Sequence, residues 1–218
     1  MRETIYTIPV NDVFEPRCGC PVCRLTEMLE DRCLDYILGA AMMEPDVRIS
    51  TNRQGFCPKH MEAMLVGKNR LSLSLMLETR LDYLKSLPAP KKNAKPQSDS
   101  CFVCSEIASA RAGILDTALR LFGADSSFRT LFEEQEYLCY PHYELLCAMT
   151  VERLPKKAQA PLLEAARRLV EKQLNRLRDE LSQFSRLYDY RSTAGQPVSE
   201  EIKTAPARTV EFLSGSPR

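Results

Sequence analysis

The chain reads Cys20-Pro21-Val22-Cys23 and then Phe56-Cys57-Pro58-Lys59-His60, and it later repeats both motifs. The second copies are Cys101-Phe102-Val103-Cys104 and Leu138-Cys139-Tyr140-Pro141-His142. Nearly the same number of residues separates the CxxC motif from the CxxH motif in the two copies. The ligand-type residues stay in register while the residues between them differ, so the repeat indicates that the fold depends on these positions.

Each copy supplies three cysteines and one histidine, which is the ligand set of a closed tetrahedral zinc site. We therefore predict two zinc ions per chain, one Cys₃His site in each copy. The predicted ligands are Cys20, Cys23, Cys57 and His60 in the first copy, and Cys101, Cys104, Cys139 and His142 in the second. Each motif precedes a predicted helix, whose positive end favours the deprotonated thiols that bind metal. A structural zinc of this kind contributes roughly 10–16 kcal/mol of apparent binding free energy, comparable with the stability of a whole domain.

The nine cysteines do not suggest a disulfide framework, because an odd number cannot pair completely within one chain. A buried cysteine can also be a small apolar core residue, and this is the interpretation we prefer for Cys33 and Cys147. Each of them falls on the apolar face of its own predicted helix. Cys18 is either an alternative ligand next to Cys20 or a free surface thiol, and we favour the free thiol.

The histidine count argues against catalysis. The chain has only two histidines, His60 and His142, and both occupy the same position of the repeated motif. If both bind metal, none remains for general acid or base catalysis or for activating a nucleophile. A site closed by four protein ligands also lacks the open position that catalytic zinc needs. We predict no catalytic residue and lean against an enzyme.

Apolar residues at helical spacing run through most of the chain and predict an all-α fold. We expect two tandem helical repeats, each pinned by a Cys₃His metal site, followed by a long C-terminal helix. The expected parts are an extended N-terminal segment over 1–19, a first repeat over 20–87, a linker over 88–100, a second repeat over 101–190 that includes a long helix at about 160–190, and a tail over 191–218. We expect 71–87 to be a central core helix because it is strongly apolar. We expect the tail to dock only through a last helical turn.

The long helix carries an apolar seam at alternating steps of three and four residues, with charged residues between them. The seam consists of Leu163, Ala166, Val170, Leu174, Leu177, Leu181, Phe184 and Tyr188. Such a seam needs a partner helix, either the core helix of the first copy or another subunit in a coiled coil. Basic residues on the same helix alternate with acidic ones, which is typical of a solvated face.

Composition limits the remaining possibilities. Lys and Arg number 30 against 29 Asp and Glu, so no overall positive field favours nucleic acid, and we consider nucleic-acid binding unlikely. No apolar run is long enough for a signal peptide or a membrane span. The expected location is the cytoplasm.

The ordered motifs resemble an uncharacterised bacterial family of unknown function with paired Cys-rich repeats. The similarity rests on Cys-Pro-Val-Cys-Arg at 20–24, Phe-Cys-Pro-Lys-His at 56–60, CxxC at 101–104, CxxH at 139–142 and Asp-Tyr-Arg at 189–191. It implies a cytoplasmic, all-helical protein and adds no activity.

Two functional hypotheses from different classes follow. The first is a zinc-stabilised helical module that binds an unknown protein, or a second copy through 163–188. The second is a thiol-based redox or metal-responsive protein whose CxxC pairs release zinc on oxidation. An iron–sulfur protein is a third and weaker hypothesis.

Overall fold

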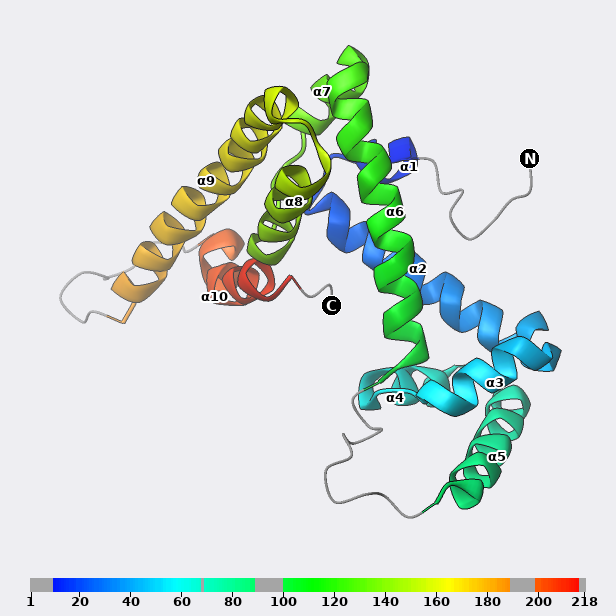
Figure 1. Cartoon of the computed structure of the whole chain (residues 1–218). Coiled ribbons are helices and arrows are strands. Elements are labelled where there is room, and N and C mark those ends of the chain that lie inside the picture. Colours follow the sequence, from blue (N-terminus) through cyan, green and yellow to red (C-terminus); the bar gives the residue numbers. More distant parts are fainter. Residues whose placement is uncertain (1–9, 68, 89–99, 189–198, 216–218) are drawn as a thin grey trace. The chain divides into compact units, whose positions relative to one another are not determined.

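The computed structural model describes residues 10–67, 69–88, 100–188 and 199–215. Throughout these residues the regular structure is helical, which confirms the all-α class (Figure 1). The helices are α1 (Val10–Phe14), α2 (Pro21–Leu38), the 3-10 helix η1 (Ala40–Met43), α3 (Pro45–Gln54), α4 (Pro58–Val66), α5 (Arg70–Ser86), α6 (Phe102–Ala124), α7 (Ser126–Glu133), α8 (Tyr140–Arg153), α9 (Lys156–Arg186) and α10 (Glu200–Ser214).

The chain forms two compact units. The terminal unit combines Met1–Leu25 with Gly113–Arg218, and the central unit is Thr26–Ala112. Helices α2 and α6 each contribute residues to both units. The units are therefore composed differently from the two sequence copies over 20–87 and 101–190.

A cluster of phenylalanines forms one end of the core of the terminal unit. The ring of Phe14 lies 5.1 Å from that of Phe128 and 5.9 Å from that of Phe132. Phe14 belongs to α1, a short helix within the segment 1–19 that we expected to be extended. Val10 and Val13 are buried with Phe14, so packing of one helical face against α7 explains the difference. Residues 1–9 lie outside the described residues.

The long helix α9 packs against α8 and α10 in the terminal unit. The structure confirms part of the apolar seam expected from the sequence. Ala166, Val170 and Leu177 are buried, whereas Leu174 is 40% exposed. The face that packs also includes Leu162 and Leu169. The helices that pack on this face, α8 and α10, come from the same chain and were not among the partners expected from the sequence. Pairing of the seam with another subunit stays a prediction.

Helix α10 is a complete helix where the sequence suggested only a docked last turn. The side chain of Ser199 caps its first turn by accepting a hydrogen bond from the amide of Ile202. Phe212 is 1% exposed, and its ring lies 6.1 Å from the ring of Tyr137. Packing of Phe212 and Ala205 in the terminal unit stabilises a helix whose own sequence gives only a weak apolar pattern.

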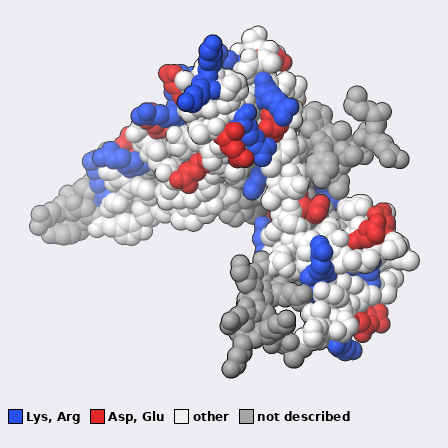
Figure 2. Space-filling view, viewed as in Figure 1, with Lys and Arg blue, Asp and Glu red and all other residues white. Residues whose placement is uncertain are grey.

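Charged side chains of both signs are interspersed on the face shown in Figure 2. On α9 the arginines form ion pairs with acidic residues, including Arg167 with Glu171 at 2.7 Å and Arg168 with Glu164 at 3.4 Å. These pairs confirm that basic and acidic residues alternate along a solvated helical face.

The central unit contains the second part of α2, η1, α3, α4, α5 and the first part of α6. Gly55 ends α3 with φ of 71°, a backbone conformation that glycine adopts without strain. The expectation that 71–87 is a central core helix is wrong. Only Ser72, Leu73 and Met76 of α5 are buried, and Leu71 is 71% exposed, because α5 packs on one side only, against α3 and α4.

Two parts of the sequence prediction fall largely outside the described residues. They are the linker over 88–100, of which only Pro88 and Ser100 are described, and the Asp-Tyr-Arg motif at 189–191. Among the described residues, none of the helices has the length and apolar character needed to cross a lipid bilayer.

Candidate metal centres

The eight predicted ligands come together in two clusters, one in each unit. The terminal cluster consists of Cys20, Cys23, Cys139 and His142, and the central cluster consists of Cys57, His60, Cys101 and Cys104. Within each cluster the four ligand atoms all lie within 4.8 Å of one another. Both groups can therefore hold a metal ion.

The assignment of one site to each sequence copy is wrong. Each cluster takes its CxxC motif from one copy and its CxxH motif from the other. The physical reason is that the N-termini of α2 and α8 bring their ligand atoms together in the terminal unit, whereas the N-termini of α4 and α6 do so in the central unit. Both assignments combine one CxxC motif with one CxxH motif, so the residue types do not distinguish them.

Each CxxH motif is placed by the start of a helix. Cys57 and Cys139 are the N-cap residues of α4 and α8, with extended backbone and a proline in the first turn. The histidine three residues later then lies on the same side of the helix. Cys57 Sγ is 3.1 Å from His60 Nδ1, and Cys139 Sγ is 3.0 Å from His142 Nδ1. In both motifs Nδ1 is the histidine nitrogen that faces the thiols.

The CxxC motifs open the other two helices in the same manner. Cys20 and Cys101 immediately precede α2 and α6, and Cys23 and Cys104 lie in the first turns. Four helix N-termini thus supply all eight ligand atoms. Helix N-termini carry partial positive charge, which stabilises thiolates.

The distances between ligand atoms suit a tetrahedral ion. With zinc–sulfur bonds near 2.3 Å and zinc–nitrogen bonds near 2.0 to 2.1 Å, a regular tetrahedron separates two sulfurs by about 3.8 Å and sulfur from nitrogen by about 3.6 Å. In the terminal cluster Cys23 Sγ is 3.6 Å from Cys139 Sγ and 3.4 Å from His142 Nδ1. Cys20 Sγ is 3.7 Å from the same nitrogen.

The central cluster has equivalent distances. Cys57 Sγ lies 3.9 Å from Cys104 Sγ, and His60 Nδ1 lies 3.3 Å from Cys101 Sγ and 3.5 Å from Cys104 Sγ. The separations in both clusters match a single central ion with four protein ligands.

Crowding of three thiols perturbs their ionisation in the terminal cluster. Burial raises the pKa of Cys20, but hydrogen bonds with Cys139, Cys23 and His142 outweigh it and bring the pKa well below its ordinary value. Hydrogen bonds with Cys139 and Cys20, together with burial, raise the pKa of Cys23. The thiolate of one cysteine thus suppresses the ionisation of the neighbouring thiol. A divalent cation at the centre would stabilise both thiolates and so lower the pKa of the second thiol.

The thiols of the central cluster behave similarly. Burial and the neighbouring Cys101 raise the pKa of Cys104 to about 12. Burial also raises the pKa of Cys57, but hydrogen bonds with the backbone of His60 and with the neighbouring thiols lower it below its ordinary value. Such a donor set suits a soft or borderline metal ion.

Glu30 on α2 lies beside the histidine of the central cluster. His60 Nε2 lies 3.1 Å from Glu30 Oε1, on the opposite side of the ring from the thiols. Lys59 Nζ holds the other carboxylate oxygen at 2.9 Å. Burial lowers the pKa of His60, although Glu30 opposes the shift, so the ring favours the neutral form that binds metal. Glu30 was not identified from the sequence, where nothing distinguishes it from other helical glutamates.

The remaining cysteines lie outside both clusters. Cys33 is 5% exposed on α2, which agrees with its prediction as a core residue, and burial raises its pKa to about 12. Cys147 is partly buried on α8, and Cys18 is exposed.

The two clusters differ in accessibility. Cys20, Cys139 and His142 of the terminal cluster are buried, and Cys23 is partly buried. In the central cluster His60 and Cys101 are buried, Cys57 is partly buried and Cys104 is exposed. The central cluster is therefore open to solvent at one of its thiols.

Comparison with known proteins gives a family and no activity. No curated protein matches the chain, and no solved structure does. The model of a family described as "Family of unknown function (DUF6062)" matches twice, over residues 1–96 and 85–218. These matches include all eight cluster residues and together extend over the whole sequence. The chain is therefore a member of the DUF6062 family.

Proposed function

We propose that this protein binds two zinc ions in closed, structural Cys₃His sites and acts as a protein-interaction module in the cytoplasm. The observation that carries the proposal is the pair of clusters, each with four ligand atoms at tetrahedral separations. The expected ligands are the eight residues already predicted from the sequence.

Zinc is the ion that these donors favour. Three thiolates and one imidazole form a common structural zinc site, whereas iron–sulfur clusters are usually held by four cysteines or, in Rieske centres, by two cysteines and two histidines. The short distances around one centre also leave room for a single ion rather than a multinuclear cluster.

A structural role follows from the topology of the ligands. The terminal cluster joins α2 to α8 across 116 residues of sequence, and the central cluster joins α4 to α6 across 47. Zinc at these positions would fix contacts between distant segments whose formation otherwise costs loop-closure entropy. With four protein ligands, neither site retains an open position for catalysis.

The proposed interaction surface lies on the central unit. Several large apolar side chains of α4 and α5 are exposed, including Leu65 at 58%, Val66 at 81% and Leu71 at 71%. The seam of α9 is less suitable than the sequence suggested, because α8 and α10 cover part of it. Exposed apolar residues gathered on adjacent helices are typical of protein-binding surfaces.

The redox hypothesis has one observation in its favour. Cys104 is exposed and its sulfur lies 3.9 Å from that of Cys57, so an oxidant can reach this pair. Release of zinc under mild peroxide, reversed by a reductant, would favour this second function. Retention of zinc would favour the structural role.

Elemental analysis tests the proposal directly. The full chain, purified without chelator or a metal-binding tag, is expected to contain about two zinc ions, one for each cluster. Stripping the metal should lower the melting temperature sharply, because each ion contributes about 10–16 kcal/mol of apparent binding free energy. Iron, or little metal together with missing free thiols, would contradict the proposal.

A further inference from the structure

We propose that the two metal sites have different tasks: the central site exchanges its zinc with external thiolate or nitrogen donors, whereas α10 seals the terminal site. This inference rests on the proposed function, since it requires zinc at both clusters. Both zinc ions stabilise the fold while they are bound, and the central one can in addition pass to an external acceptor.

The C-terminal end of α10 lies directly against the terminal cluster. The sulfur of Cys23 is 3.7 Å from the carbonyl oxygen of Gly215. Gly215 has φ of 63°, the left-handed conformation that ends α10. A Cβ at this position would lie 3.3 Å from Cys139 Sγ and 3.2 Å from Pro141 Cγ. The backbone approaches the sulfurs this closely because residue 215 has no side chain.

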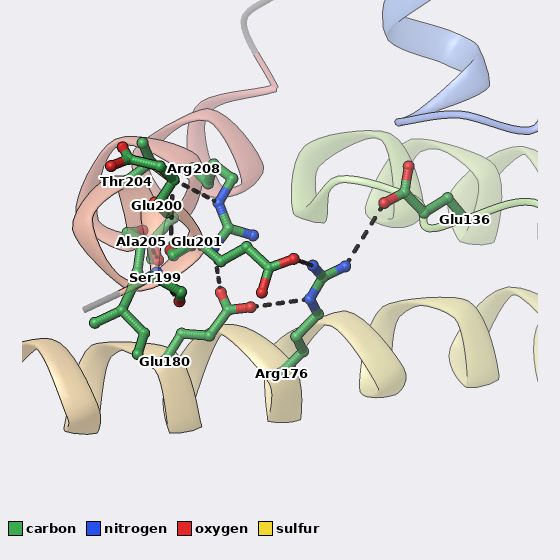
Figure 3. Close-up of polar contacts among 11 residues, drawn as sticks. Glu136, Arg176, Glu180, Ser199, Glu200, Glu201, Thr204, Ala205 and Arg208 are labelled. Carbon is green, nitrogen blue, oxygen red and sulfur yellow. Dashed lines mark hydrogen bonds and ion pairs between the residues drawn. The ribbon is translucent and has the colours of Figure 1, made fainter. Parts of the chain in front are cut away.

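An ion-pair network holds the other part of α10 in place (Figure 3). Arg208 of α10 lies 2.5 Å from Glu180 of α9, and Glu180 also pairs with Arg176 at 2.9 Å. Arg176 reaches Glu201 of α10 at 3.8 Å and Glu136 at 3.7 Å. Glu180 is only 8% exposed, so the solvent screens this part of the network weakly.

The same network continues to the metal ligands. The carboxylate of Glu136 accepts a hydrogen bond of 2.6 Å from the amide of Gly19, the residue before Cys20. Helix α10 is thus connected to the terminal cluster at both ends, through Gly215 directly and through Arg176 and Glu136 indirectly. Helix α10 therefore hinders an external donor on the side of Cys23 and Cys139.

The central cluster has an accessible ligand. Cys104 is exposed and Cys57 is partly buried, whereas His60 and Cys101 anchor the site from the interior. The contacts that the structure gives to Cys104 Sγ are with Cys57 and His60, which belong to the same cluster. An external donor therefore approaches the ion from the side of Cys104.

The exchange step needs no change of oxidation state. Cys104 and then Cys57 would release the ion, and each sulfur would keep the electron pair of its bond to the metal. An incoming thiol would bind as its thiolate and give its proton to the released sulfur. With a thiolate or nitrogen donor, that proton would come from the solvent. The acceptor class is a chelator, or a protein site, with thiolate or nitrogen donors.

Zinc release into the chromogenic chelator 4-(2-pyridylazo)resorcinol tests the proposal on the full-length zinc-loaded protein. Two phases of equal amplitude are expected, with the first at least about tenfold faster. In Cys104→Ser the fast phase should disappear while the slow phase remains. In Arg208→Ala, which loosens α10, the slow phase should accelerate while the fast phase is unchanged.

A second measurement needs no variant. Zinc-loaded natural protein is treated with N-ethylmaleimide and the labelled cysteines are identified by mass spectrometry at successive times. Cys18 is exposed and Cys33 is buried, so they serve as fast and slow internal standards. Cys104 should be labelled next after Cys18, together with loss of one zinc, and long before Cys20 and Cys139.

Several outcomes would overturn the proposal. A single release phase would show that the sites are equivalent, and labelling of Cys20 or Cys139 before Cys104 would show that the terminal site is the open one. A protein that binds fewer than two zinc ions refutes the proposed function instead, and elemental analysis before the kinetics distinguishes that failure.

Discussion

The sulfurs of Cys23 and Cys139 lie 3.6 Å apart, although 116 residues separate the two cysteines in the chain. The contact joins the first CxxC motif to the second CxxH motif. Every ligand of the terminal cluster therefore depends on a contact between the two sequence copies.

Paired serine variants test this crossed arrangement. Cys20→Ser with Cys139→Ser removes two ligands from one cluster, so the protein should keep the zinc of the central site. Cys20→Ser with Cys57→Ser removes one ligand from each cluster and should weaken both. The measurement is zinc retained after dialysis against a moderate chelator. If each copy formed its own site, the two results would be exchanged.

Loss of a ligand should be far more damaging than loss of a core thiol. Cys33→Ala truncates a buried side chain outside the clusters and should reduce the free energy of unfolding by about 1 kcal/mol. Cys139→Ser should unfold the terminal unit, and Cys57→Ser the central unit, because the proposed zinc ion in each site would contribute an energy comparable with the stability of a domain. Equal shifts of the melting temperature in all three variants would count against metal binding.

Glu30→Gln should weaken zinc binding at the central site. The carboxylate 3.1 Å from His60 Nε2 supports the metal-facing nitrogen, and loss of such an outer partner typically costs about 10–100-fold in metal affinity. Competition titration with a chelator measures the effect. The control is Glu78→Gln, an exposed residue of α5, which should leave both affinities unchanged.

Gly215→Val should displace the end of α10. The new side chain would meet Cys139 Sγ and Pro141, and valine is disfavoured at φ of 63°. We expect a lower melting temperature and faster zinc release from the terminal site. Gly113→Ala is the matched control: its Cβ meets nothing within 4 Å, and within α6 alanine should add about 0.5–1 kcal/mol of stability.

Asp125→Ala should lower the melting temperature through loss of a helix cap. The carboxylate of Asp125 accepts hydrogen bonds from the amides of Ser127 at 2.8 Å and Phe128 at 3.3 Å, at the start of α7. Asp125→Asn keeps an acceptor at the same position and should stay close to the natural protein. Equal melting temperatures for the alanine and asparagine variants would show that the cap contributes nothing.

Local features of the fold were predictable from the sequence, and distant ones were not. The helix start at Pro21, the stop at Gly55 and the cap at Asp125 depend on neighbouring residues, so their signals lie within a few positions. The extent of α10 depends on the packing of Phe212 near Tyr137, far away in the chain. The exposure of α5 depends on how many helices pack around it. The many leucines in its sequence predicted burial, but they do not indicate how many neighbouring helices there are.

The candidate sites show the same division. All eight cluster residues were identifiable because metal ligands need particular side chains at particular local spacings. The partner of each motif was not identifiable, because exchanging the two CxxH motifs leaves every residue type unchanged. Glu30 has no sequence pattern of its own, since only its distance from His60 gives it a role.

The crossed arrangement sets an order of assembly during synthesis on the ribosome. Cys57 and Cys104 are 47 positions apart in the chain, whereas Cys23 and Cys139 are 116 apart. After Cys23 has been synthesised, the ribosome needs on the order of ten seconds to reach Cys139. During that interval Cys20 and Cys23 can meet Cys57 and His60, the mispaired set that the repeated motifs permit. The nascent chain must avoid or dissolve this pairing before the terminal cluster can form.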